Sequence, residues 1–232
     1  TNLISNATDA PTITTTDLSF TFRDCTNFNG NVGSWSVSAV INMSFMFSFA
    51  SAFNNGGSSS IGSWNTSSNT SMASMFSGAT AFNQNIGAWN TAAVNSMAST
   101  FSTATNFNQA LSFNTALVTN MSSMFNGCSA FNQPLSFNTG AVTTMATMFQ
   151  GASAFNSALN FTSTAVVTTM SSMFSSATNF NQSLSFNTAL VNNMSNMFQF
   201  ATAFNQPLSF NTGAVTNMNG MFEYTSSLTD VG

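Results

Sequence analysis

The sequence predicts a repeat solenoid in which coils of roughly 24 residues stack on one another. Three patterns, each repeated along most of the 232-residue chain, support this prediction. The first is Met-x-x-Met-Phe, the second is Phe-Asn six residues further on, and the third is an aliphatic residue followed by an aromatic one. All three occur in MSSMFNGCSAFNQPLSFNTGAVTT, residues 121–144.

An anchor methionine begins each repeat and fixes the period. Successive anchors are 29, 25, 24, 24, 25, 24 and 24 residues apart. They are Met43, Met72, Met97, Met121, Met145, Met170, Met194 and Met218. The long first step comes from an insertion at residues 55–60, NGGSSS, which we expect to bulge as a flexible loop without interrupting the stack.

Two short elements are expected in each repeat. Met-x-x-Met-Phe places apolar side chains at i, i+3 and i+4, the spacing of one helical or 3₁₀ turn. The alternating pattern from Leu135 to Phe137 predicts a short strand with two side chains facing inward. One repeat cannot bury its apolar residues alone, so we expect parallel strands to stack into about nine rungs with a shared core. Residues 17–232 form this solenoid, and residues 1–16, which match no repeat, are predicted to be an N-terminal cap or linker.

The composition excludes several classes of protein. Hydrophobic residues make up 43% of the chain, with 26 Phe, which is ample material for a core. Charged residues make up only 3%, and a single Lys or Arg within a net charge of −4 leaves nothing to neutralise phosphates. We therefore exclude nucleic acid as a partner. Polar residues interrupt every apolar segment, so no direct membrane insertion is expected.

No catalytic or metal site is predicted, and no cofactor. The chain has no His, no paired carboxylates within one repeat and no glycine-rich phosphate loop, so we expect a protein that is not an enzyme. The methionines recur at fixed apolar positions and are assigned to the core. Cys25 and Cys128 lie in a column otherwise filled by Ala, four rungs apart, which is too far for a disulfide within the chain.

Polar residues also recur in columns. The Asn that follows the repeat Phe predicts an asparagine ladder that binds the backbone of neighbouring coils, with direct ligand binding as the alternative. A second column is predicted to form a surface ladder that could contact glycans, ice or other copies of the chain, with solvated turn residues that bind nothing as the alternative. Its members are Thr66, Thr91, Thr115, Thr139, Thr188 and Thr212.

The few charges lie near the two ends of the chain. Arg23 and Glu223 occupy the same column, one residue after the repeat Phe, and residues 25–222 contain no charge. Exposed solenoid ends are prone to association. We therefore expect head-to-tail stacking in which Arg23 of one copy lies near Glu223 of the next.

The repeat resembles a known family. Phe-Asn-Gln-x-Leu-Ser-Phe-Asn-Thr-x-x-Val-Thr-x-Met, seen at residues 131–145, resembles the bacterial surface protein 26-residue repeat family, which is BspA-like and similar to leucine-rich repeats. The resemblance covers residues 17–232. It implies a leucine-rich-repeat-like protein that is extracellular or on the surface of a cell, virus or filament, where it contacts other surface proteins. Candidate N-glycosylation sites are Asn6, Asn42, Asn65, Asn120, Asn160 and Asn193.

We predict from these features an extracellular structural or adhesive repeat protein that stacks head to tail into a fibre. The alternative is a ligand-binding module that uses its Thr, Ser and Asn rows to bind glycans or ice. Electron microscopy, glycan arrays and thermal hysteresis distinguish these functions.

Overall fold

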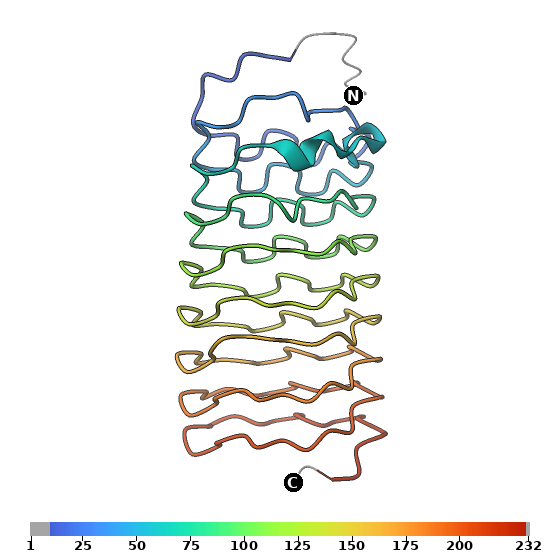
Figure 1. Ribbon diagram of the computed structural model, residues 1–232. Helices are drawn as coiled ribbons and strands as arrows, with labels where there is room; N and C mark the ends of the chain where they lie inside the picture. The colour runs from blue at the N-terminus through green and yellow to red at the C-terminus, as the bar shows by residue number, and fades with distance from the viewer. Residues whose placement is uncertain (1–9, 231–232) are drawn as a thin grey trace.

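The chain forms a stack of coils. A computed structural model describes residues 10–230. In Figure 1 the chain winds repeatedly around one axis, and the first and last described residues lie at opposite ends of the stack. No helix in the described part of the chain has the length and apolar character needed to cross a membrane.

Each coil is linked to the next by a parallel bridge at the residue before the anchor. We number the coils 1 to 9 by these residues, which in order are Asp17, Asn42, Ser71, Ser96, Asn120, Thr144, Thr169, Asn193 and Asn217. The anchor then opens a segment that we call the turn segment, residues 121–128 in coil 5. Coil 9 is described over residues 217–230 only.

The turn segment is a series of overlapping turns, and the expected helical turn does not form there. Every second N–H, such as that of Phe47, donates to a carbonyl of the next coil, here that of Met75 at 2.9 Å. The intervening N–H groups, such as that of Met46, donate three residues back within the same coil. Two residues in each segment have positive φ, as Ser123 does at 55°. A residue in this left-handed region interrupts a right-handed helix, so the helical part of the prediction is not confirmed.

The expected Leu-Ser-Phe strands are also not confirmed. In these stretches the described chain contains only two isolated bridges, Leu135 to Leu159 and Leu184 to Leu208. Pro134 and Pro207 precede two of these leucines and have no N–H to donate, so the pairing cannot extend through them. The helices of the described chain are two 3₁₀ helices, η1 (Asn55–Gly57) and η2 (Ser59–Ser63).

Helix η1 lies within the predicted insertion, η2 begins in the insertion and runs beyond it to Ser63, and both are held against the stack (Figure 1). Asn55 is fully buried, and its Oδ1 accepts a hydrogen bond from the Val32 N–H at 2.8 Å. Asn29 Oδ1 accepts another from the Gly56 N–H at 2.9 Å. The insertion is therefore an ordered element that hydrogen-bonds to coil 1, which differs from the flexible loop that we expected.

Stacked aromatic rings fill the core. Phe131 in coil 5 lies 6.1 Å from Phe107 in coil 4 and 5.9 Å from Phe155 in coil 6, between ring centroids. Within its own coil it lies 4.1 Å from Phe125. Parallel rings at these separations bury large apolar areas and favour stacking in register. The methionine columns are also buried, as expected, up to coil 8.

The asparagine ladder is confirmed. Asn108 Oδ1 accepts a hydrogen bond from the Asn132 N–H at 2.9 Å, and Asn132 Oδ1 accepts one from the Asn156 N–H at 2.8 Å. The same contact recurs from Asn29 to Asn205. The Gln133 side chain also donates, through Nε2, to Asn108 Oδ1 at 3.0 Å. The ladder joins consecutive coils by a bond that depends on the Asn side chain.

The predicted cap, residues 1–16, is described only from residue 10 onward. We call residues 10–16 the lead-in segment. Its Thr16 carbonyl accepts hydrogen bonds from the Ile41 and Asn42 N–H groups, and Ile13 is partly buried against the core. The lead-in segment therefore continues the stack on one side beyond coil 1.

Candidate interface at the ends of the stack

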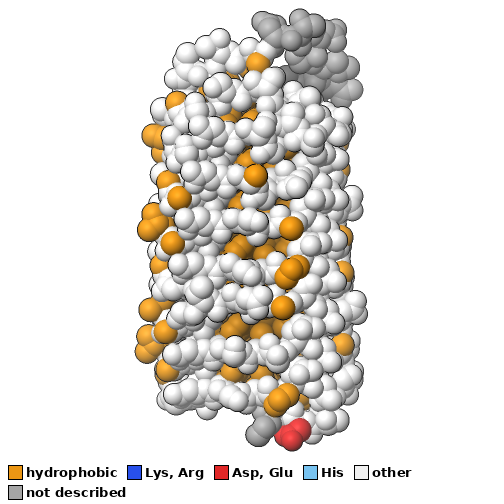
Figure 2. All heavy atoms as spheres, in the orientation of Figure 1, with side chains coloured by type: hydrophobic (Ala, Val, Ile, Leu, Met, Phe, Trp, Pro, Cys, Tyr) orange, Lys and Arg blue, Asp and Glu red, His pale blue; other side chains and the backbone are white. Residues whose placement is uncertain are grey.

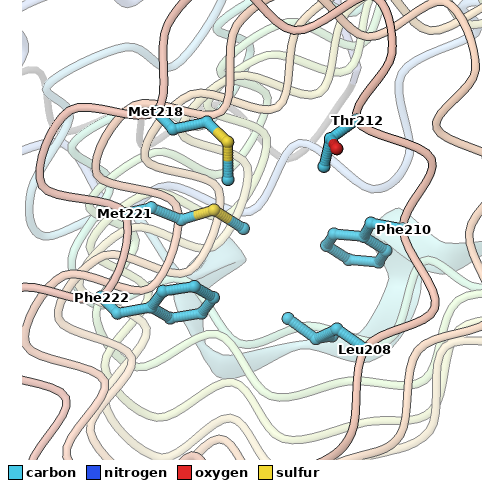
Figure 3. A pocket seen from close by; sticks show the side chains of 6 residues that line it. All are labelled: Leu208, Phe210, Thr212, Met218, Met221 and Phe222. Atoms are coloured by element: carbon cyan, nitrogen blue, oxygen red, sulfur yellow. The ribbon is translucent and has the colours of Figure 1, made fainter. Parts of the chain in front are cut away.

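The coil 9 end of the stack has an open apolar cavity. It holds about 140 Å³ and is lined by Leu208, Phe210, Thr212, Met218, Met221 and Phe222. Figure 3 shows the side chains of Met218 and Met221 pointing across the cavity toward Phe210 and Thr212. Met218 is 43% exposed, whereas the equivalent Met194 of coil 8 is fully buried. The cavity occupies the space that the next coil fills elsewhere in the stack.

A row of hydrogen-bond donors surrounds one side of this cavity. In coils 1 to 8 the N–H groups of alternate turn-segment residues donate to the following coil. In coil 9 the equivalent N–H groups have no acceptor among the described residues. They belong to Met218, Gly220, Phe222 and Tyr224.

The coil 1 end presents the complementary acceptors. In coils 2 to 9 the carbonyls of the alternate residues accept from the preceding coil. The equivalent carbonyls of Ser19, Thr21 and Arg23 accept no hydrogen bond within the described chain, while that of Asp17 accepts one from the Thr15 hydroxyl. The two ends therefore carry matching rows of donors and acceptors, and an unpaired backbone group gains by finding a partner.

The charged residues lie near these rows. Arg23 is in coil 1 and Glu223 is in coil 9, so the structure places them at opposite ends of one chain. Arg23 Nε lies 3.4 Å from Asp24 Oδ2, and its guanidinium lies 5.6 Å from the Phe20 ring centroid. Glu223 Oε2 accepts a hydrogen bond from Gln199 Nε2. In Figure 2 acidic side chains are visible at the coil 9 end.

Aromatic residues also gather in the turn segments near both ends, which the repeat pattern did not predict. They stand at the two left-handed positions of the turn segment, where coils 3 to 7 have Ser, Thr or Gly. They are the exposed Phe20, Phe49, Phe200 and Tyr224 and the half-buried Phe45. Phe20 stacks on Phe45 at 4.9 Å, and Phe200 on Tyr224 at 4.7 Å. The available signal was the substitution of large for small residues in these two columns at both ends of the repeat array.

These aromatic side chains are held at an energetic cost. A bulky residue with positive φ is strained by about 1–3 kcal/mol, and such outliers are often associated with function. Tyr224, with φ of 59°, is 63% exposed, so burial in this chain does not offset the strain. Phe20 and Phe200 are likewise 49% and 42% exposed.

The predicted threonine surface ladder is wrong. Thr66, Thr91, Thr115, Thr139 and Thr188 are at most 1% exposed, and Thr212 is exposed only because it lines the open cavity. The buried hydroxyls donate to a carbonyl of the next coil, as Thr115 Oγ1 does to Asn138 at 2.9 Å. The side chain can enter the core because this bond satisfies its polar group. A signal was present, since coil 1 has Val37 in this column.

The candidate glycosylation sites differ in their exposure to solvent. Asn65 and Asn160 are exposed, whereas Asn42, Asn120 and Asn193 are half-buried in the bridge column. In that column the Oδ1 of Asn120 accepts a hydrogen bond from the Ser122 N–H at 2.9 Å. Asn6 lies outside the described residues.

The cysteines and acidic residues form no joint site. Both cysteines are free, Cys25 half-buried in coil 1 and Cys128 buried in coil 5. Burial raises the pKa of the Cys128 thiol far above its ordinary value. Within residues 10–230 no group of three His, Cys, Asp or Glu side chains could hold a metal ion.

Comparison with known families corrects the resemblance that the sequence suggested. The chain matches four overlapping times, at residues 4–112, 56–162, 111–185 and 158–231, a model described as "Mycoplasma protein of unknown function, DUF285". The prediction of the bacterial surface protein 26-residue repeat family is therefore wrong, because the family model that matches is a different one. No curated protein matches the chain. The overlapping matches cover nearly the whole length, so this is a repeat protein that belongs to the DUF285 family.

Proposed function

We propose that the protein is a structural, nonenzymatic repeat protein whose copies stack head to tail into a fibre. The proposal extends the stack of coils into a continuous solenoid that passes from one copy to the next. The observation that supports it best is the complementarity of the two ends. Within the described part of the chain, the N–H groups of Met218, Gly220, Phe222 and Tyr224 have no acceptor at one end, and the carbonyls of Ser19, Thr21 and Arg23 have no donor at the other.

The apolar cavity at coil 9 adds a driving force. Association would remove Met218, 43% exposed, and the half-buried Phe222 from water. Burial of apolar surface contributes about 25 cal/mol per Å². At coil 1 the side chains of Leu18 and Phe22 are only 6% and 7% exposed, so the apolar contribution comes mainly from the coil 9 side.

The body of the stack favours close approach of copies. Residues 25–222 carry no charge, so copies that meet end to end have little long-range repulsion to overcome. The charged residues lie near the ends, where Arg23 and Glu223 have opposite signs. These opposite charges favour the contact between the coil 9 end of one copy and the coil 1 end of the next over contacts that join two like ends.

Light scattering coupled to size-exclusion chromatography tests the proposal. The purified chain is expected to increase in mean mass with concentration. Met218→Lys should abolish the increase, because stacking would bury an unpaired charge in the methionine column. Leu190→Lys is the matched control, since Leu190 is 54% exposed but lies on the side of the stack.

Three outcomes would contradict the proposal. One is a wild-type chain that remains a monomer at all concentrations. Another is equal association by wild type and Met218→Lys. A third is loss of association in Leu190→Lys alone, which would indicate lateral contacts.

The location proposed for such a fibre is the cell surface or the extracellular space, where a structural or adhesive role would be exerted. Protease treatment of intact cells tests it. Digestion of the protein under conditions that spare a cytoplasmic marker supports the location, and protection until the cells are broken contradicts it.

A further inference from the structure

We infer that two stacked copies share one coil, to which the first copy contributes residues 217–230 and the second contributes its lead-in segment, residues 10–16. This inference rests on the proposed head-to-tail stacking and specifies its register. The occupant of the open cavity is then the coil 1 end of a second copy.

The described parts of the two ends are complementary halves. At one end coil 9 has a turn segment but no described residues that cover Leu208, Phe210 and Thr212 from the next level. At the other end the lead-in segment lies one level beyond coil 1, with Thr16 joined to Ile41 by a 2.7 Å hydrogen bond. Placed together, the two halves occupy one level of the stack.

The hydrogen-bond columns fix the register. The Asn217 column begins at Asp17, so Asp17 of the second copy becomes the next member after Asn217 of the first. Met218 N–H then faces the Asp17 carbonyl, and Gly220, Phe222 and Tyr224 face Ser19, Thr21 and Arg23 in turn. One residue before the bridge column, the Thr16 N–H of the second copy faces the Thr216 carbonyl, just as within the chain the Thr216 N–H donates to the Asn192 carbonyl at 2.9 Å.

The same register brings the left-handed aromatic residues of both copies to one junction. Phe200 and Tyr224 of one copy are brought to the same edge and adjoining levels as Phe20, Phe45 and Phe49 of the next. In the column of Phe200 and Tyr224 the second copy has Asp24 and then Phe49, whereas Phe20 and Phe45 stand in the other left-handed column, four residues earlier in the turn segment. The strained residues thus cluster at the junction between copies.

The register also places charges in favourable contact. Glu223 and Arg23 occupy equivalent positions in adjacent levels of the shared stack, about 4.8 Å apart along its axis. Both side chains are exposed, so the pair favours this orientation of the two copies but contributes little to the free energy of association. A shift by one coil would separate Arg23 from Glu223. It would also move the lead-in segment out of the level that it shares with residues 217–230.

Cysteine cross-linking tests the shared coil. In a chain that carries Cys25→Ala and Cys128→Ala, Arg23→Cys is mixed with Glu223→Cys, and separately Thr16→Cys with Thr216→Cys. Alanine fills the cysteine column in most coils, so the background substitutions suit the fold. Equivalent positions in adjacent coils are about 4.8 Å apart, within the range of about 4.4–6.8 Å that a disulfide requires.

Both mixtures are expected to give disulfide-linked dimers under mild oxidation, and each variant by itself is expected to give none. Asn126→Cys mixed with Glu223→Cys is the matched control, because Asn126 stands in the same column in coil 5. Association by light scattering without cross-links in either mixture would overturn the shared coil while leaving self-association intact. Linked dimers of Glu223→Cys by itself would instead show a tail-to-tail contact, and a chain without association would overturn the proposed function.

Discussion

Replacement of Asn69 by Val should stabilise the fold. Asn69 is fully buried in a column that contains Val40 and Val94 in the neighbouring coils. Among the described residues its Oδ1 is the one buried side-chain oxygen or nitrogen without a hydrogen-bond partner. Its Nδ2 donates at 3.2 Å to the Ile41 carbonyl, which already accepts from the Thr70 N–H at 2.8 Å.

The magnitude follows from these two atoms. A buried polar group without a partner costs about 1–3 kcal/mol, and an ordinary hydrogen bond contributes about 0.5–1.5 kcal/mol. Asn69→Val removes the first and loses one bond to a carbonyl that keeps its other donors. Val also adds apolar burial at a position of matching shape. We therefore expect an increase of about 1–2 kcal/mol in the free energy of unfolding.

Urea unfolding, followed by tryptophan fluorescence and circular dichroism, measures this change. For a chain of this size about 1 kcal/mol corresponds to a shift of about 2–4 °C in Tm. A repeat stack can unfold in parts, so amide hydrogen exchange in coils 2 and 3 should be measured as well.

The reverse substitution is the control. Val118→Asn, in the same column of coil 4, should destabilise the chain by about 1–3 kcal/mol because it creates the same orphaned oxygen. An Asn69→Val chain that is no more stable than wild type, or a Val118→Asn chain of unchanged stability, would refute the reasoning.

Three further predictions concern the core, the thiols and one carboxyl group. Phe131→Ala should cost about 3–5 kcal/mol, because it removes a ring from the centre of the stack, and an unchanged urea midpoint would contradict this. A thiol reagent should label Cys25 in the folded chain and Cys128 only after unfolding, since Cys128 is buried and its pKa is raised; equal labelling would contradict the burial. Hydrogen bonds from Ser19 lower the pKa of Asp17 below 3.8, so its contribution is present above that pH and lost as pH falls through the lowered pKa. Asp17→Asn should make unfolding less sensitive to pH in this acid range, and an identical pH profile for both chains would contradict it.

The repeat and its buried columns could be predicted from the sequence because apolar residues recur with a constant period. Met and Phe at fixed steps have few alternatives to burial, and the Asn after Phe is a small polar residue beside a core position. The burial of the Thr115 side chain could not be predicted in the same way. Its burial depends on a carbonyl of the next coil, which is a contact between residues far apart in the sequence.

The local conformation of the turn segment could not be predicted from the repeat period either. The spacing of Met121, Met124 and Phe125 fits a helical turn, but Ser123 between them has positive φ and its N–H donates to the next coil. Residues with positive φ are usually Gly or Asn. Gly127 fits that pattern, whereas Phe20 and Tyr224 do not. The left-handed conformation of these aromatic residues could therefore be found only from the backbone of the structure.

Electron microscopy of the purified chain at high concentration tests the central claim most directly. Nine coils at about 4.8 Å each predict filaments one stack wide with an axial repeat of about 43 Å. Filaments with this repeat, absent in Met218→Lys and present in Leu190→Lys, are the expected result. Single particles one chain long at every concentration, or sheets of chains joined side by side without the axial repeat, would contradict head-to-tail stacking.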